Sequence, residues 1–373
     1  MLRMGAKVFL HIGTRKSGTS YVQWALRDTP EVLAGQGVDL TFRTRDGQVA
    51  QQLNPLREFL RTGDPADMRE RNAALAERIR ASGMTQLITL EDLAELPRPA
   101  VDLVMEGLSE FDVELIVTMR HWASVIPSEW QQSVKERYTG GYLDYVQAIR
   151  DGSAEAEVFL SRQDVPAILR RWGAALAPEK IHVLVVPSDG GSNRHLLELF
   201  CGIVGIDAST LRSPKARINS SLSLPQAEML RRVNIELGDR LPDRFTTYAK
   251  GVREWLTRGS LMKHPGGKIL LPTGYEQWCA EVAAEHRDAI VAMGVNVVGD
   301  VADMVPDLDR LETADPVVPD EEIAAHAVLT IADMAAMHWD ERQVPAAPAA
   351  PAPMTMGRLA RGVLRRARRV LPG

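Results

Sequence analysis

The chain has 373 residues, of which 45% are hydrophobic and 25% charged, and its formal net charge is −5 at pH 7. This length supports a large hydrophobic core, and the composition is that of a globular protein. A negative net charge argues against general affinity for nucleic acid. The two cysteines, Cys201 and Cys279, are too few and too far apart for a disulfide framework or a zinc site.

The first predicted element is a buried strand over residues 8–12, which form an apolar run. A glycine-bracketed turn from Gly13 to Ser20 follows, and a helix is expected from Tyr21 onward. Such a loop directs backbone N–H groups to one point, and the helix N-terminus adds positive charge there. The sequence therefore predicts an anion site, and the alternative is a turn that only links strand to helix.

Two glycines in this loop have the spacing of the nucleotide-binding pattern G-x-x-x-x-G-K-[ST]. They are Gly13 and Gly18, but Thr19 stands where that pattern has lysine. The lysine of the loop is Lys16, which comes before the second glycine. Lys16 still reaches the phosphate end of a ligand, but it does so from a position before the second glycine and not after it.

The rest of the chain alternates predicted strands and helices as far as residue 205. Strands are expected over 37–40, 86–90, 113–119 and 181–186, with an edge strand over 295–298. Helices are expected over 66–81, 99–110, 127–138, 141–150, 164–176 and 193–204. Beyond residue 205 the pattern is mostly helical, over 223–237, 275–293 and within 319–339. Residues 44–65 and 251–273 are expected to be irregular. The alternation predicts an α/β fold with a parallel sheet covered on both faces.

Three of the predicted strands end in polar or charged residues. The first leads into the loop with Lys16, the next ends at Glu91 and Asp92, and the third ends at Arg120. In open α/β sheets, ligands bind beyond the carboxyl ends of the strands. If these strands are neighbours, their polar ends converge on one site.

Arg120 and Ser128 form a second signal, because an arginine at a strand end precedes a serine on the following helix. A guanidinium grips a phosphate through two hydrogen bonds, and a hydroxyl from another element fixes the orientation of that phosphate. The alternative is a surface arginine with a serine at the start of a helix.

Residues 11–20, HIGTRKSGTS, closely resemble the 5′-phosphosulfate loop of sulfotransferases, which use 3′-phosphoadenylyl sulfate as donor. Arg120 and Ser128 have the separation of the Arg and Ser in the 3′-phosphate site of that family. Further stretches are similar to actinobacterial sulfotransferase-like proteins: 88–96, 115–138, 163–172 and 296–306. Arg15 departs from the family, which often has proline there, and so do His121 and Trp122 after the arginine.

The resemblance implies a P-loop-like parallel sheet flanked by helices, in a sulfotransferase domain over 1–340 with its α/β core over 7–205. It implies that Lys16 stabilises the leaving phosphate. It also implies that the loop N–H groups hold the 5′-phosphosulfate with the residues Arg15, Ser17, Gly18, Thr19 and Ser20. No metal is implied, because sulfuryl transfer does not require one.

Glu91 is the candidate base, as family members that modify alcohols use a carboxylate near this strand end. Its alternative role is that of an acid in the first turn of a helix, and Asp92 is the second candidate. His11 lies within a strand and is expected to be a packed core histidine, whereas His121 is a weaker candidate base.

Two further features were considered for ligand binding. The basic loop over 263–268 is a suggested additional contact to the 3′-phosphate. Trp130, Trp172 and Trp255 are candidates for an acceptor pocket, although tryptophan in a helix is more often part of the core.

The C-terminal part is expected to consist of a Pro/Ala linker over 341–354 and a basic tail over 355–373. The tail carries six arginines and no acid, so it is either a basic amphipathic helix on an anionic membrane face or a disordered tail. No signal peptide is predicted, and no apolar run approaches the roughly 18 residues of a spanning helix. We therefore expect a cytoplasmic protein, with contact at the inner face of the membrane if the tail binds lipid.

The expected reaction is sulfuryl transfer to a hydroxyl or amine of a carbohydrate, lipid or small molecule. A P-loop kinase is one alternative, disfavoured by Thr19 in place of the lysine. An inactive nucleotide-binding scaffold, tethered to membrane by its tail, is the other.

Overall fold

The computed structural model describes residues 6–41, 64–187, 193–213, 221–243 and 246–343. The basic tail and nearly all of the predicted irregular region over 44–65 lie outside these residues. Among the residues described, no helix has both the length and the apolar character needed to cross a membrane.

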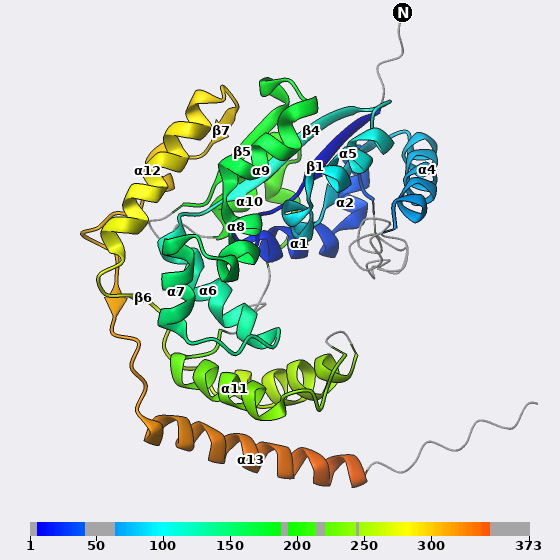
Figure 1. Cartoon of the computed structure of the whole chain (residues 1–373). Coiled ribbons are helices and arrows are strands. Elements are labelled where there is room, and N and C mark those ends of the chain that lie inside the picture. Colours follow the sequence, from blue (N-terminus) through cyan, green and yellow to red (C-terminus); the bar gives the residue numbers. More distant parts are fainter. Residues whose placement is uncertain (1–5, 42–63, 188–192, 214–220, 244–245, 344–373) are drawn as a thin grey trace, which may run out of the picture.

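A six-stranded parallel sheet forms the centre of the α/β half (Figure 1). Its strand order is β2-β3-β1-β4-β5-β7. The strands are β1 Lys7–His11, β2 Val38–Leu40, β3 Thr85–Thr89, β4 Asp112–Met119, β5 Ile181–Val185 and β7 Asn296–Val298. The predicted parallel sheet is confirmed, and each predicted strand lies within a residue of an observed one. A separate two-stranded sheet joins β6 (Leu271–Pro272) to β8 (Thr313–Ala314).

Strand β1 lies between β3 and β4, so the expected convergence of the three strand ends is confirmed. His11, the last residue of β1, lies opposite Thr89 on one side and Ile116 on the other. Parallel strands end at the same edge of a sheet, so the segments that follow β1, β3 and β4 lie next to one another. That edge is where an open α/β sheet binds its ligands.

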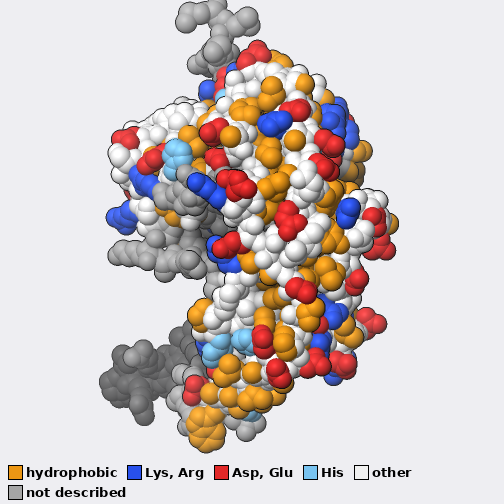
Figure 2. Space-filling view, turned by 90° about the vertical axis from the view of Figure 1, so that its left-hand side faces the viewer, with side chains coloured by type: hydrophobic (Ala, Val, Ile, Leu, Met, Phe, Trp, Pro, Cys, Tyr) orange, Lys and Arg blue, Asp and Glu red, His pale blue; other side chains and the backbone are white. Residues whose placement is uncertain are grey.

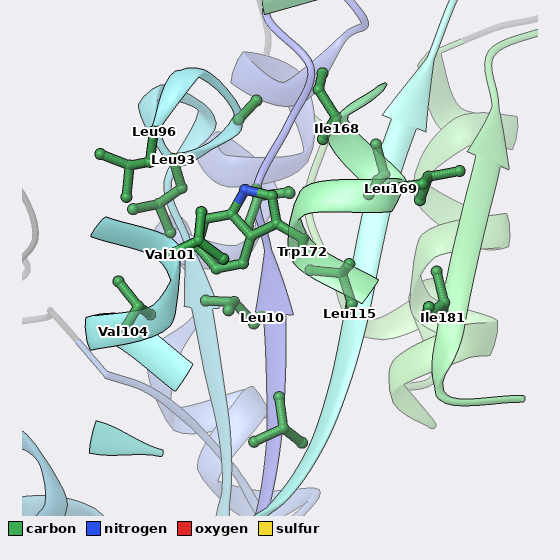
Figure 3. Packing of buried hydrophobic residues seen from close by; sticks show 14 of the residues in the cluster. Leu10, Leu93, Leu96, Val101, Val104, Leu115, Ile168, Leu169, Trp172 and Ile181 are labelled. Carbon is green, nitrogen blue, oxygen red and sulfur yellow. The ribbon is translucent and has the colours of Figure 1, made fainter. Parts of the chain in front are cut away.

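Alternating side chains of β1 supply a core on each face of the sheet. Leu10 packs on one face with α4 (Pro65–Ser82), α5 (Arg98–Gly107) and α9 (Val165–Trp172). Figure 3 shows the Trp172 ring of α9 among Leu10, Val101 and Leu115. The opposite face carries Phe9 and the remaining helices of this half, α1 Thr19–Asp28, α2 Pro30–Gly35 and α10 Asn193–Val204. The sheet is therefore buried on both sides, as its apolar strands predict.

The second half of the molecule is helical and has a core of its own below the sheet in Figure 1. Its helices are α6 Trp122–Lys135, α7 Tyr142–Asp151, α8 Glu157–Gln163, α11 Leu224–Leu237, α12 Glu276–Ala292 and α13 Asp320–Gln343. Buried residues from α6, α7, α11 and α13 meet in this core. Helix α6 follows directly from β4, so it connects the ligand edge of the sheet to the helical half.

The helices predicted to begin at residues 164 and 223 are observed, and each begins with a hydrogen bond between residues close in sequence. The carboxylate of Asp164 caps α9 by accepting a hydrogen bond of 2.9 Å from the Ala167 N–H. At the start of α11, Gln226 Oε1 accepts a hydrogen bond of 2.8 Å from the Ser223 N–H. Such contacts involve residues close in sequence, which is why the pattern alone locates them.

Other predicted boundaries are wrong. The helix expected over 127–138 begins at Trp122, with Pro127 inside it. A proline normally marks the first turn, because it lacks an N–H and crowds the preceding turn. Here Trp122, Val125 and Ile126 are buried ahead of it, and their packing extends the helix in the N-terminal direction.

Three helical segments were not expected from the sequence. Helix α8 was not predicted, and α13 runs three residues into the region expected to be linker. Within the segment expected to be irregular, Ala249–Arg258 forms a π-helix, η7. Its buried residues Val252 and Leu256 pack into the helical core.

Candidate functional site

The loop after β1 is shaped by three residues in left-handed conformation. Gly13 has φ of 99°, Lys16 of 61° and Gly18 of 81°. A Cβ on Gly13 would lie 3.1 Å from the Glu91 Cα, and one on Gly18 would lie 2.5 Å from the Leu196 side chain. Gly13 is therefore favoured both by its close contact with the Glu91 backbone and by its positive φ. Gly18 is favoured mainly by its positive φ, because the end of the Leu196 side chain can move. Lys16 is a non-glycine residue held in a sparsely populated conformation, as often occurs at functional sites.

The loop ends at an uncapped helix N-terminus. Helix α1 begins at Thr19, its N-cap is Gly18, and no side chain caps it. Its first turn also contains no acidic residue. The first N–H groups of a helix have no intrahelical acceptor, and the helix dipole is positive at this end. The loop therefore presents the N–H groups and positive charge that an anion requires.

Ser17 differs from the expectation that its side chain holds the phosphate. Its side chain is fully buried, and its hydroxyl donates to the Thr14 carbonyl at 2.5 Å. The Thr118 hydroxyl lies 2.6 Å away on β4, and Thr118 O accepts a hydrogen bond of 2.7 Å from the Thr14 N–H. Ser17 thus ties the loop to β4, and its hydroxyl does not face a ligand.

Arg15 connects the loop to the helical half. Its guanidinium donates to Glu136 at 2.9 Å, just after α6, and the side chain is only 12% exposed. The Arg15 carbonyl accepts a hydrogen bond of 3.0 Å from Gln163 Nε2 at the end of α8. Glu136 raises the pKa of Arg15 against the opposing effect of burial. The charge of Arg15 is therefore largely matched within the protein.

A cavity of about 460 Å³ opens over the loop, and we call it the loop cavity. Its lining includes five expected residues, Arg15, Lys16, Gly18, Thr19 and Ser20, together with Glu91 and Ser128. Further lining residues come from α6 and η7: Gln131, Gln132, Lys135, Arg253, Thr257 and Arg258. Cations far outnumber carboxylates on these walls, so the cavity suits an anionic ligand.

Lys16 is buried at the centre of the loop. Its Nζ donates a hydrogen bond of 3.0 Å to Gln132 Oε1 on α6. Burial lowers the pKa of Lys16; the buried Glu129 opposes this effect, and nearby Arg15 adds to it. The ammonium group is thus positioned from both sides, by its own loop and by α6.

Lys135 shows how closely the cations of the loop cavity are placed. Burial lowers its pKa to about 8, and the positive charges of Lys16 and Arg258 contribute to the shift. Its Nζ donates to Gln131 Oε1 at 3.0 Å, which is a neutral acceptor. A bound anion would relieve this crowding of positive charge.

Glu91 is the acid that lines the loop cavity. It lies in the turn η2 (Glu91–Glu95) that follows β3, and the Thr19 hydroxyl donates a hydrogen bond to its carboxylate. Asp92 lines neither this cavity nor the one described next. The structure therefore places Glu91, and not Asp92, on the wall of the loop cavity.

A second cavity of about 420 Å³ adjoins the first, and we call it the Arg120 cavity. Arg120, His121, Ser128, Lys268 and Arg310 are among its lining residues, and Ser128, Gln131 and Ser221 line both cavities. The basic loop over 263–268 thus reaches this cavity through Lys268.

The Arg120 side chain is partly buried, and burial lowers its pKa. In the described part of the chain it has neither a hydrogen bond nor an ion pair. A partly buried cation without a partner is costly, so the cavity is suited to a ligand that supplies the missing anion.

The two histidines considered earlier are held in the neutral form. His11 is fully buried, its Nδ1 lies 2.8 Å from the Thr89 hydroxyl, and burial lowers its pKa to about 3. The interpretation as a packed core histidine is confirmed. For His121, burial and the adjacent Arg120 lower the pKa to about 4.

None of the three tryptophans considered for an acceptor pocket lines either cavity. Trp130 and Trp172 are fully buried in the cores, as tryptophan in helices usually is.

Several residues of the site were not found from the sequence. On α6, Gln132 and Lys135 follow the predicted Ser128 at helical spacing and line the loop cavity with it. That spacing is visible in the sequence once Arg120 has been singled out. In contrast, Gln163 and the η7 residues reach the loop only through tertiary packing. No local pattern indicates them.

Comparisons with known proteins leave the chemistry of this site open. No protein-family model matches the chain, and no curated protein matches it. Among solved structures, the chain is similar to the crystal structure of a sulfotransferase from Alicyclobacillus acidocaldarius. The two are 12% identical with a TM-score of 0.35, and the match covers 63% of this chain and 95% of that one. At this identity and TM-score, the likeness does not bear on what the site binds.

Among the described residues, no group of three or more His, Cys, Asp or Glu side chains is arranged to hold a metal ion.

Proposed function

We propose that the protein transfers a sulfuryl group from 3′-phosphoadenylyl sulfate to a hydroxyl or amine of an acceptor. The observation that carries this proposal is the pairing of two adjacent cavities in which cationic side chains outnumber carboxylates. In the Arg120 cavity, Arg120, Lys268 and Arg310 lie with the two acids Asp307 and Glu312. One contains a helix N-terminus with Lys16, and the other contains the partly buried Arg120, which has no ion-pair partner among the residues that the structure describes. A donor with a 5′-phosphosulfate and a separate 3′-phosphate supplies one anion to each.

In this assignment, the 5′-phosphosulfate occupies the loop cavity. The N–H groups at the start of α1, that of Thr19 included, and the hydroxyl of Ser20 hold its phosphate. Ser17 shapes the loop through its hydrogen bond to Thr14 and leaves phosphate binding to its neighbours. The charge of Arg15 is engaged by Glu136, so Arg15 acts mainly as a positioning residue.

The 3′-phosphate occupies the Arg120 cavity. Arg120 offers paired N–H donors, and Ser128 adds a hydroxyl from α6. Lys268 lines the same cavity and adds positive charge. Because ATP and ADP have no 3′-phosphate, this cavity discriminates the sulfuryl donor from them.

The reaction requires a base, an electrophile and a stabilised leaving group. The acceptor oxygen forms a bond to sulfur while the bond from sulfur to the bridging oxygen breaks, and the proton of the acceptor passes to the Glu91 carboxylate. The electron pair of the broken bond stays with 3′-phosphoadenosine 5′-phosphate, where Lys16 offsets the growing negative charge. Glu91 and Lys16 line the same cavity, as these roles require.

The remaining charge of the loop cavity favours an acceptor that is itself anionic. Lys135, Arg253 and Arg258 line the cavity in addition to the loop residues. An acidic sugar or a phosphorylated alcohol would place its negative group among them. A screen with matched pairs of neutral and acidic sugars, read by release of 3′-phosphoadenosine 5′-phosphate, should show faster turnover of the acidic member.

The donor assignment is tested by calorimetric titration with 3′-phosphoadenosine 5′-phosphate, with ADP and ATP as comparators. We expect the first to bind at least tenfold more tightly than the others. A preference for ATP would favour the kinase alternative. Binding of all three with equal affinity, or of none, would contradict the assignment of the Arg120 cavity. Tight donor binding without turnover of any acceptor would favour a nucleotide-binding scaffold.

A further inference from the structure

Helix α13 packs with one side against the helical half of the molecule. Ile323 and Thr330 are buried on this side, next to α11. Further along the helix, the Asp333 carboxylate accepts a hydrogen bond of 2.7 Å from Ser260 and lies 2.8 Å from His264 Nε2. These contacts fix the rotation of α13 about its own axis, and they therefore determine which of its residues face away from the protein.

The opposite side of α13 is apolar and exposed. Val328 and Ile331 are each 66% exposed and Trp339 is 64% exposed. Exposed alanines complete a stripe along the helix, which we call the outer stripe: Ala324, Val328, Ile331, Ala332, Ala335 and Trp339. In Figure 2, orange side chains gather at the lower end of the molecule, where α13 lies. A surface helix normally turns polar residues to solvent, so an apolar stripe of this length indicates a contact surface.

The outer stripe is complementary to itself when two copies run antiparallel. Its small and large residues are arranged so that a two-fold axis between positions 331 and 332 sets a small residue against a large one. The facing pairs are Ala324 with Trp339, Val328 with Ala335, and Ile331 with Ala332. Helices pack closely when large side chains meet small ones in this way. A two-fold interface uses the same patch on both subunits, as this pattern requires.

The charges along α13 favour the same arrangement. The helix begins with Asp320, Glu321 and Glu322, and Arg342 lies near its end. An antiparallel pair opposes the two helix dipoles. A parallel pair would instead bring the two acidic ends together and set Trp339 against Trp339.

We propose that a second copy of this chain docks on the outer stripe, with the two α13 helices antiparallel about a two-fold axis. An anionic membrane fits the stripe less well, because the three acids at the start of α13 would be repelled from it. This inference does not depend on the identity of the donor or the acceptor.

Sedimentation velocity of the full-length chain at micromolar concentration tests the proposal. We expect a dimer that the Ile331→Glu variant converts to a monomer, since this change sets two carboxylates beside the axis. Val317→Glu is the matched control, because Val317 is 73% exposed and lies outside α13. A monomeric wild-type chain, or a dimer that survives Ile331→Glu, would overturn the proposal.

Thiol cross-linking with a short reagent tests the orientation. Ala332→Cys is expected to link to itself across the axis. Ala324→Cys alone is expected not to link, because its two copies would be about 22 Å apart along the pair at ~1.5 Å per residue. A mixture of Ala324→Cys and Trp339→Cys chains should link. The native thiols of Cys201 and Cys279 are buried and should not interfere. Self-linking of Ala324→Cys would contradict an antiparallel pair.

Two further results would identify another occupant and overturn the proposal. If the full chain is monomeric and removal of residues 344–373 makes it dimeric, the tail of the same chain covers the stripe. If the full chain is monomeric and binds vesicles of phosphatidylglycerol, and Ile331→Glu abolishes that binding, the stripe contacts lipid.

Discussion

The loop cavity and the Arg120 cavity differ in how their cations are partnered. In the loop cavity, Arg15 pairs with Glu136 and Lys16 donates to Gln132, so acceptors within the protein hold both side chains in place. In the Arg120 cavity, the guanidinium has no such partner among the described residues. On the proposed assignment, the first cavity is therefore formed in advance of binding, whereas in the second the ligand would compensate a partly buried charge. Mutations should consequently affect turnover in one cavity and affinity in the other.

The largest expected effect is on turnover, from Lys16→Ala. Loss of the ammonium group removes charge stabilisation from the leaving phosphate and should lower kcat by about 10²–10³-fold. The affinity for 3′-phosphoadenosine 5′-phosphate should fall far less. Steady-state kinetics together with calorimetry measures both. Lys180→Ala, at an ion pair with Asp112, is the control. Full activity of the Lys16 variant would rule out this role.

The next effect is on affinity, from Arg120→Ala. Charge-assisted hydrogen bonds to the 3′-phosphate are worth about 2–3 kcal/mol, so the Kd for 3′-phosphoadenosine 5′-phosphate should rise by about 30- to 150-fold. Binding of AMP, which has no 3′-phosphate, should change little. The exposed Arg98, paired with Asp102, provides the control variant Arg98→Ala. Equal losses for the two nucleotides would show that Arg120 does not recognise the 3′-phosphate.

A smaller effect should follow from loosening the loop through Gln163→Leu. This change removes the hydrogen bond to the Arg15 carbonyl and should lower the free energy of unfolding by about 1 kcal/mol. We also expect roughly a tenfold loss of kcat, since the loop positions Lys16. Thermal unfolding and kinetics are the measurements, with Gln147→Leu on the exposed side of α7 as control. An unchanged kcat would mean that the loop holds its shape without Gln163.

The smallest expected effect is on the pH dependence of stability, through Lys135. Its pKa is about 8 in the folded protein and ordinarily 10.5, so between these values the unfolded chain binds more protons. The stability should therefore rise with pH across this window, by about 1.4 kcal/mol for each unit of pKa shift that is realised. In Lys135→Met, urea titrations at pH 7 and 10 should show a smaller rise than in the wild-type chain.

Ligand binding provides the opposite test of Lys135. A phosphate in the loop cavity should raise the pKa of Lys135, so 3′-phosphoadenosine 5′-phosphate should bind with proton uptake near pH 8.5. Calorimetry in two buffers of different ionisation enthalpy measures this uptake. Its absence would indicate that no ligand phosphate approaches Lys135.

The features that could be predicted from the sequence are those encoded locally. The apolar run of β1 and the glycines of its loop specify a strand, a turn and a helix within a short stretch. The place of Arg120 next to that loop followed from the rule that parallel strands end at one edge.

The remainder of the site depends on contacts between residues distant in sequence. Nothing near Ser17 indicates that its hydroxyl bonds to Thr118 on β4 and turns away from the ligand. Gln163 reaches the Arg15 carbonyl only because α8 packs beside the loop. The π-helix places Thr257 on the cavity wall through an irregularity that side-chain periodicity does not reveal.

Ser128 and Gln131 form one turn of α6 and line both cavities. If the proposed assignment holds, the two cavities act together as one receptor for a ligand with two anionic groups. A ligand that carries two anionic groups at the matching distance needs one encounter. Once the first group is seated, the second is present at high effective concentration beside its own cavity. Free phosphate gains nothing from this arrangement. Because α6 fixes the distance between the two cavities, we expect the protein to select ligands by the distance between their two anionic groups more than by their total charge.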